Sequence, residues 1–181
     1  MKSDGSMVML RIVFLLLLLV SSTGRAVSHG HGHVQMQGTI IDTACAIATG
    51  DVEQGIDFGA LTASELINNG RGPSLPFTVH LVNCVLDGTD IRGLNHWKDV
   101  RITFVGDADS ENHFALQGDG RGAALVIADS QGVEAKPGEP MPSTPITPGS
   151  MALHYQLWLT GGKTIRPGHI HTTVRYFMEY D

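Results

Sequence analysis

Residues 168–181 read Gly-His-Ile-His-Thr-Thr-Val-Arg-Tyr-Phe-Met-Glu-Tyr-Asp, and their pattern is the strongest structural signal in the chain. From residue 170 onward the side chains alternate between two faces, which is the period of a β-strand. We expect one long strand over residues 170–180. Chain ends usually fray unless they are tied down, so this strand is predicted to be paired within a sheet. One of its faces carries Ile170, Thr172, Val174, Tyr176, Met178 and Tyr180.

Strand patterns also recur upstream of this segment, in residues 77–82, 100–104, 123–128 and 153–159. Gly161-Gly162 predicts a hairpin turn between two strands. The proline-rich residues 137–148 indicate a loop or irregular edge, and only residues 61–67 favour a short helix. Several short strands separated by turn residues predict an antiparallel β-sandwich in one domain.

The composition excludes several other classes of protein. The chain has 181 residues, of which 42% are hydrophobic and 17% are charged, with 22 glycines and a net charge of −6. Intrinsic disorder needs higher charge and lower hydrophobicity, and a nucleic-acid partner would call for a basic surface. The many glycines disfavour a helical bundle, because glycine destabilises a helix interior by about 1 kcal/mol relative to alanine.

The first residues are typical of a secretory signal peptide. Lys2 and Arg11 precede an apolar run over residues 12–20, which is shorter than the roughly 20 residues of a membrane span. We expect cleavage after Gly24-Arg25-Ala26, so that residues 1–26 are removed; translation could start at Met1, Met7 or Met9. In an oxidising compartment, Cys45 and Cys84 are predicted to form one disulfide, and the absence of a Cys-x-x-C pair disfavours a metal or redox role.

The segment that follows the predicted cleavage site alternates as well. Its glycines would weaken an isolated strand but allow another backbone to approach closely. Residues 27–37 are therefore predicted to insert into a narrow groove, and the alternative is a disordered tail. The small and apolar face of the segment consists of Ser28, Gly30, Gly32, Val34 and Met36.

The opposite face of this segment carries His29, His31 and His33, which could hold Zn²⁺ or Cu²⁺. His169 and His171 are a candidate second pair, whereas the other histidines are scattered along the sequence. The alternative is a solvent-facing strand edge, where histidine is a tolerated polar residue. No nucleophile elbow or zinc-binding helix motif is present, so neither an enzyme nor a cofactor is expected.

Several motifs together resemble the pilin subunits of chaperone–usher fimbriae of the type 1 and P pilus kind. Gly168 is fourteenth from the end and Tyr180 is penultimate, which is the most specific feature. The remaining motifs occur in the family's order: Gly-Thr-Ile before Cys45, Ile56-Asp57-Phe58-Gly59, Phe-Thr-Val-His-Leu-Val-Asn-Cys at 77–84, and the run ending in Asp129.

The resemblance implies an incomplete immunoglobulin-like sandwich that lacks its final strand. Residues 38–181 would form the pilin domain, with Cys45–Cys84 joining its first strand to a neighbouring strand. A periplasmic chaperone, and then residues 27–37 of the next subunit, would fill the groove; an outer-membrane usher would be the third partner. The groove-edge and chaperone-contacting residues would be Gly168, Thr172, Val174, Tyr176, Met178 and Tyr180.

The function implied is that of a structural subunit that polymerises by donor-strand exchange and contributes to cell adhesion. It would be exported through the periplasm to the surface fimbrium of a Gram-negative bacterium. Gly30 and Gly32 resemble major rod pilins, whereas residues 128–147 look more like minor subunits that end or anchor a pilus. The alternatives are a secreted β-sandwich binding module and a histidine-rich periplasmic metal-binding protein.

Overall fold

The computed structural model describes residues 35, 37, 43–90 and 93–181. The chain divides into two compact units, Met1–Thr39 and Ile40–Asp181. The predicted signal peptide, residues 1–26, and the five predicted donor residues, Ser28 to Met36, lie outside the described residues. The fold given below is that of the second unit. Among the described residues, no helix is long and apolar enough to cross a membrane.

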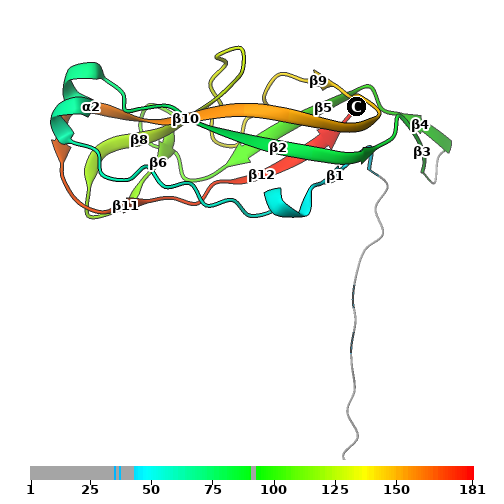
Figure 1. Ribbon diagram of the computed structural model, residues 1–181, viewed down its shortest axis with the longest axis horizontal. Coiled ribbons are helices and arrows are strands. Elements are labelled where there is room, and N and C mark those ends of the chain that lie inside the picture. The colour runs from blue at the N-terminus through cyan, green and yellow to red at the C-terminus, as the bar shows by residue number, and fades with distance from the viewer. Residues whose placement is uncertain (1–34, 36, 38–42, 91–92) are drawn as a thin grey trace, which may run out of the picture. The chain divides into compact units, whose positions relative to one another are not determined.

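A five-stranded antiparallel sheet forms one layer of this unit (Figure 1). The long strand β10 lies at its centre and is paired with β2 on one side and with β8 on the other. The order across the sheet is β1 (Ala46–Ile47), β2 (Leu75–Cys84), β10 (Gly149–Arg166), β8 (Arg121–Asp129) and β6 (Phe114–Ala115).

Smaller sheets form the rest of the unit. A three-stranded sheet has the order β12 (Arg175–Tyr180), β5 (Asp99–Val105) and β9 (Thr144–Pro145). Two further pairs are β11 (Ile170–His171) with β7 (Gln117–Gly118), and β3 (Asp87–Asp90) with β4 (Gly93–His96). The helical elements are η1 (Thr49–Asp51) and α2 (Ala63–Asn69).

The hydrophobic core lies between the five-stranded sheet and the three-stranded sheet. Alternate residues of each strand face it, as Val79 and Leu81 do on β2, and both are fully buried. Phe104 of β5 lies at the centre, with its ring centroid 6.1 Å from that of Phe77 and 5.1 Å from that of Tyr155. This two-layer packing confirms the predicted antiparallel sandwich.

The predicted disulfide between Cys45 and Cys84 is present. Both cysteines are buried, and the bond joins the residue before β1 to the last residue of β2. The chain-entropy account gives a loop of this size about 4 kcal/mol of stabilisation, because the cross-link restricts the unfolded chain. The bond also fixes where the chain enters the sandwich.

The prediction of a hairpin at Gly161-Gly162 is wrong, because β10 continues through both residues to Arg166. The register against β8 shifts between Gly161 and Arg166, so the glycines mark an irregularity within one strand. A side chain on Gly161 would crowd Leu66, whose Cβ atom would be 3.0 Å from the added carbon. Close packing of α2 on β10, rather than a turn, therefore requires this glycine.

The expected long C-terminal strand is interrupted. Its alternation of exposed and half-buried residues persists, but β11 pairs with β7 whereas β12 pairs with β5, and residues 172–174 lie between them outside any strand. A change of pairing partner has no local sequence signal.

The short helix expected over residues 61–67 begins and ends two residues later, as α2. Thr62 caps α2 by accepting a hydrogen bond from the Glu65 N–H group.

Gly122 provides a test of the contact between β8 and β10. It has φ +84, and an added Cβ would overlap the carbonyl oxygen of Thr164; Gly132 has φ +82 but open space around it. We expect Gly132→Ala to lower the free energy of unfolding by about 1–2 kcal/mol, from the left-handed backbone alone. Gly122→Ala should lose about 1–3 kcal/mol more through overpacking. Equal losses in urea unfolding would contradict this.

Candidate functional site

Strand β12 is paired along one edge only. Tyr176 to Tyr180 lie opposite Phe104 to Val100 of β5, and β12 ends the order of its sheet. Within the described part of the chain, no strand pairs with its second edge. The N–H and C=O groups that point away from β5 are therefore available to another extended chain.

The inner face of β12 is only half covered. On β5, Val100, Ile102 and Phe104 are between 1% and 3% exposed. Their ladder partners Tyr180, Met178 and Tyr176 contact the same core but remain partly exposed, and no residue of β12 is buried. The core thus loses its cover toward the unpaired edge, as expected of a sandwich that is one strand short.

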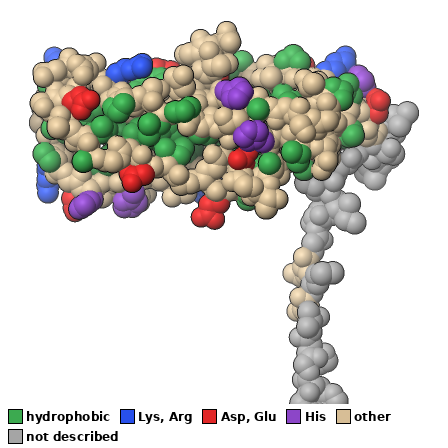
Figure 2. Space-filling model, viewed as in Figure 1, with side chains coloured by type: hydrophobic (Ala, Val, Ile, Leu, Met, Phe, Trp, Pro, Cys, Tyr) green, Lys and Arg blue, Asp and Glu red, His purple; other side chains and the backbone are tan. Residues whose placement is uncertain are grey.

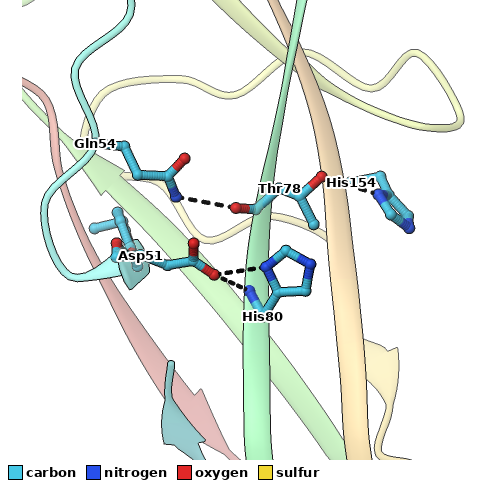
Figure 3. A network of polar contacts seen from close by, with 6 residues as sticks. Asp51, Gln54, Thr78, His80 and His154 are labelled. Carbon is cyan, nitrogen blue, oxygen red and sulfur yellow. Dashed lines mark hydrogen bonds and ion pairs between the residues drawn. The ribbon is translucent and has the colours of Figure 1, made fainter. Parts of the chain in front are cut away.

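The segment of residues 52–61 forms the other wall of this opening. Its start is tied to both sheets: Gln54 donates to the Thr78 carbonyl oxygen of β2 (Figure 3), and Asp51, the residue before the segment, accepts from the Tyr176 hydroxyl of β12. Among the described residues, none of its backbone groups bonds to another backbone group. Val52 is 67% exposed and Ile56 is 39% exposed, while Phe58 and Leu61 are partly buried against the core. We call the half-covered apolar surface that this segment and the inner face of β12 form together the groove.

Two tyrosines of β12 connect the walls of the groove. The Tyr176 hydroxyl donates to the carbonyl oxygen of Asp51, and the Tyr180 hydroxyl donates to that of Cys45 at 3.2 Å. Burial raises the pKa of both phenols, and the nearby Asp51 charge adds to the effect on Tyr176. Both therefore remain hydrogen-bond donors at neutral pH, and they hold β12 at a fixed distance from β1 and η1.

A polar network anchors the start of the wall segment to β2 (Figure 3). The Asp51 carboxylate accepts from the His80 backbone N–H group at 2.6 Å and lies 2.8 Å from the His80 Nδ1 atom. Gln54 donates through Nε2 to the Thr78 carbonyl oxygen at 2.9 Å, and Thr78 in turn contacts His154. The His80 backbone N–H group, with its imidazole, lowers the pKa of Asp51 although desolvation opposes this effect.

The structure places the predicted groove-edge residues in two groups. Tyr176, Met178 and Tyr180 line β12, and Val174, just before it, also packs against the core. Thr172 lies between β11 and β12. Gly168 lies farther back and approaches the backbone of residues 119 and 120 so closely that a side chain would collide with it. Its requirement for glycine is therefore a packing requirement.

Sequence reasoning missed the wall of residues 52–61. The motif Ile56-Asp57-Phe58-Gly59 could have indicated this wall, because its apolar residues follow neither a strand nor a helix pattern, and the structure places them outside any strand or helix. The histidines at 29, 31 and 33 lie outside the described residues. His169 and His171 are exposed, and the residues that the structure describes contain no group of three or more His, Cys, Asp or Glu side chains suited to a metal ion.

Asp51 allows the anchoring network to be tested by pH. Because its pKa lies below the ordinary value of 3.8, the stabilisation is fully present above that value and is lost as the pH falls through the folded-state pKa. Asp51→Asn should lower the free energy of unfolding at pH 7, and this deficit should shrink below about pH 4. Urea titrations would measure it, with exposed Asp57→Asn as the control. A deficit independent of pH would contradict the prediction.

Comparisons with known proteins agree with this geometry. The fimbrial protein family matches residues 34–181. The PRS fimbrial minor pilin protein of Escherichia coli is 31% identical over 154 residues, covering 83% of this chain and 77% of that protein. The Major MR/P fimbria protein of Proteus mirabilis (strain HI4320) is 27% identical, covering 91% of this chain and 92% of that protein.

Solved structures identify the fold. The crystal structure of the P pilus rod subunit PapA has a TM-score of 0.65 at 19% identity, covering 77% of this chain and 100% of that chain. A chaperone–usher pilus structure has a TM-score of 0.66 at 21% identity, covering 86% and 99%. The sandwich is thus an incomplete immunoglobulin-like fold. The chain belongs to the fimbrial protein family, and is a pilin, a structural and non-enzymatic subunit of the surface pili of Gram-negative bacteria.

Proposed function

We propose that the groove binds a β-strand donated by the neighbouring subunit, and that this strand is the segment corresponding to residues 27–37. The observation that carries the proposal is the edge of β12, which is unpaired among the described residues while its inner face is only half buried. A donated strand would satisfy the backbone groups of β12 and cover Tyr176, Met178 and Tyr180. Strand addition at a sheet edge is a general mode of peptide recognition, and chaperone–pilin complementation is one of its known cases.

The sequence of the extension supports this role. Ser28, Gly30 and Gly32 are small, and Val34 and Met36 on the same face are apolar. Glycines let the donated backbone approach closely the tyrosines that connect the groove walls. Valine and methionine would fill the wider part of the opening, while the three histidines would face solvent. The segment thus combines backbone pairing with side chains at alternate positions.

An uncovered groove would promote aggregation, so partners are needed to cover it during export and assembly. An unpaired edge beside exposed apolar side chains is a template for aggregation. Residues 1–26 would direct export, a periplasmic chaperone would cover the groove, and an outer-membrane usher would catalyse its replacement by the next extension. Each subunit then uses one surface to donate and another to accept. Such a head-to-tail contact grows into a filament that also serves adhesion.

A donor peptide in trans tests the proposal. A synthetic peptide of residues 27–37, added to the mature chain of residues 27–181, should raise the midpoint of thermal unfolding. At about 100 times its dissociation constant the peptide contributes about 2.7 kcal/mol, or about 5–10 °C for a domain of this size. The same peptide with Gly30→Arg should have no effect. A chain that unfolds cooperatively as a monomer, indifferent to the peptide, would contradict the proposal.

Neighbouring positions of β12 give a matched test of which face the donor covers. Met178 faces the core and is half buried, whereas Phe177 points outward and is 48% exposed. Met178→Glu should weaken peptide binding by at least about tenfold, because the carboxylate would be buried without a partner. Phe177→Glu should change binding by less than about threefold. Met178→Ala, a milder change, should lie between them in fluorescence anisotropy. Equal effects at 177 and 178 would refute this orientation.

A further inference from the structure

We propose that neighbouring subunits contact each other through opposite ends of the pilin unit. The basic end of one subunit binds the acidic end of the next. The inference rests on the strand donation proposed above. The helix end comprises residues 63–72, 118–122 and 161–169. The exit end comprises residues 43–45, 84–88, 96–99 and 179–181.

Hydrogen bonds bring the three parts of the helix end together. The Gly161 N–H group donates to the carbonyl oxygen of Gly70 at 3.1 Å. The Asp119 N–H group donates to the carbonyl oxygen of His169 at 2.9 Å, and Arg121 lies opposite Arg166 in the ladder. At the exit end, the Val85 N–H group donates to Ala44 and that of Lys98 donates to Asp181.

The helix end concentrates positive charge in an acidic protein. It contains four Lys or Arg residues, Arg71, Arg121, Lys163 and Arg166, but only two carboxylates, Glu65 and Asp119. Figure 2 shows both basic and acidic side chains at this end of the visible face. The net charge of the whole chain is −6. The helix end therefore carries a net positive charge although the whole chain is net negative.

Two of these four cations contact uncharged groups: Arg71 lies over the Trp158 ring, 4.8 Å from its centroid, and Arg121 donates to the carbonyl oxygens of Gly118 and Gly120. In the described part of the chain none of the four forms an ion pair, although Arg101 pairs with Asp181 and Lys136 with Glu139. Arg121 and Arg166 occupy facing ladder positions, where like charges destabilise a sheet. An anionic partner would relieve that repulsion.

The exit end has the opposite character. Its described side chains include four carboxylates, Asp87, Asp99, Glu179 and Asp181, and one lysine, Lys98. The Asp87 and Asp181 side chains are 81% and 58% exposed, although Asp87 contacts the His96 imidazole at 2.7 Å and Asp181 pairs with Arg101. Arg101 also lies opposite Glu179 in the ladder, so Asp99 is the carboxylate of this end with neither an ion pair nor a facing cation among the described residues. Among the described side chains, each end also exposes a large aliphatic residue, Val85 at the exit end and Ile67 at the helix end. The two surfaces therefore complement each other in charge, with an apolar residue on each.

Chain connectivity determines which ends meet. Only residues 38–42 separate the extension from Thr43, and five extended residues span at most about 18 Å. A unit that donates residues 27–37 must therefore place its exit end near the accepting groove. The accepting unit donates its own extension to a third unit, so its exit end already lies against the groove of that third unit. The helix end of the accepting unit is therefore free to contact the exit end of the donating unit.

Zero-length carbodiimide coupling tests this contact, because it joins an amine only to a carboxylate in direct contact. We would mix isotope-labelled and unlabelled mature chains, residues 27–181, and identify cross-links between copies by mass spectrometry. Lys163 should couple to Asp87 or Asp181 of another copy, while Lys136, which lies in neither end, should not. Lys163→Glu with Arg166→Glu should slow association about tenfold at low salt and less than twofold at about 0.3 M salt. Adding copies with Asp87→Lys should restore the rate. Lys163→Glu alone is compared with Lys136→Glu, which makes the same change of charge outside both ends.

The outcomes separate this inference from the proposed function. If the donor peptide fails to stabilise the parent chain, strand donation is wrong and the end contact fails with it. If the peptide stabilises every variant equally but association is unchanged by charge reversal, or no dimer or polymer forms, only the end contact is wrong. Binding of the helix end to anionic vesicles, with no cross-links between copies, would also overturn it in favour of a membrane partner.

Discussion

Strand β12 is hydrogen-bonded to β5 along one edge, and the rest of the site depends on the edge that remains unpaired among the described residues. Backbone N–H and C=O groups need partners once water is removed from them, so this edge can be buried only by another extended chain. The apolar side chains on the inner face of β12 add the second requirement, because they cover the core only in part. The same missing element therefore leaves both backbone pairing and side-chain burial incomplete, and one strand can satisfy both.

A sandwich that lacks a strand could bury its exposed apolar side chains by moving β12 and the segment of residues 52–61 closer together. Specific bonds oppose that here. Cys45 is fixed to Cys84, and Asp51 is held by the His80 backbone. Tyr176 and Tyr180 of β12 donate to the carbonyl oxygens of Asp51 and Cys45, just before the wall segment. Directional bonds set a spacing, whereas packing alone would favour the shortest one. These bonds would preorganise the groove for the proposed donor strand and so reduce the ordering cost of binding.

Much of this architecture could be predicted from alternation and cysteine count, because both report local or covalent constraints. The sandwich, the disulfide and the inward face of residues 174–180 are examples. What failed depended on contacts distant in sequence. Gly161-Gly162 reads as a turn, but its glycines accommodate α2 against β10. The break at residues 172–174 reflects a change of pairing partner, and the wall of residues 52–61 has no periodicity because it lies in no sheet.

In the proposed strand donation, backbone hydrogen bonds supply affinity but are the same for any extended chain, so the choice of neighbour falls to side chains at alternate positions and to surfaces outside the groove. Opposite charges at the two ends supply what the groove lacks. Electrostatic complementarity steers encounter and rejects wrong orientations more than it adds affinity. Two exit ends brought together would oppose carboxylates to carboxylates, and two helix ends would oppose arginines to arginines. In a chain with only 17% charged residues, such clustering gives the filament its direction before the donated strand, through burial and backbone pairing, makes the contact lasting.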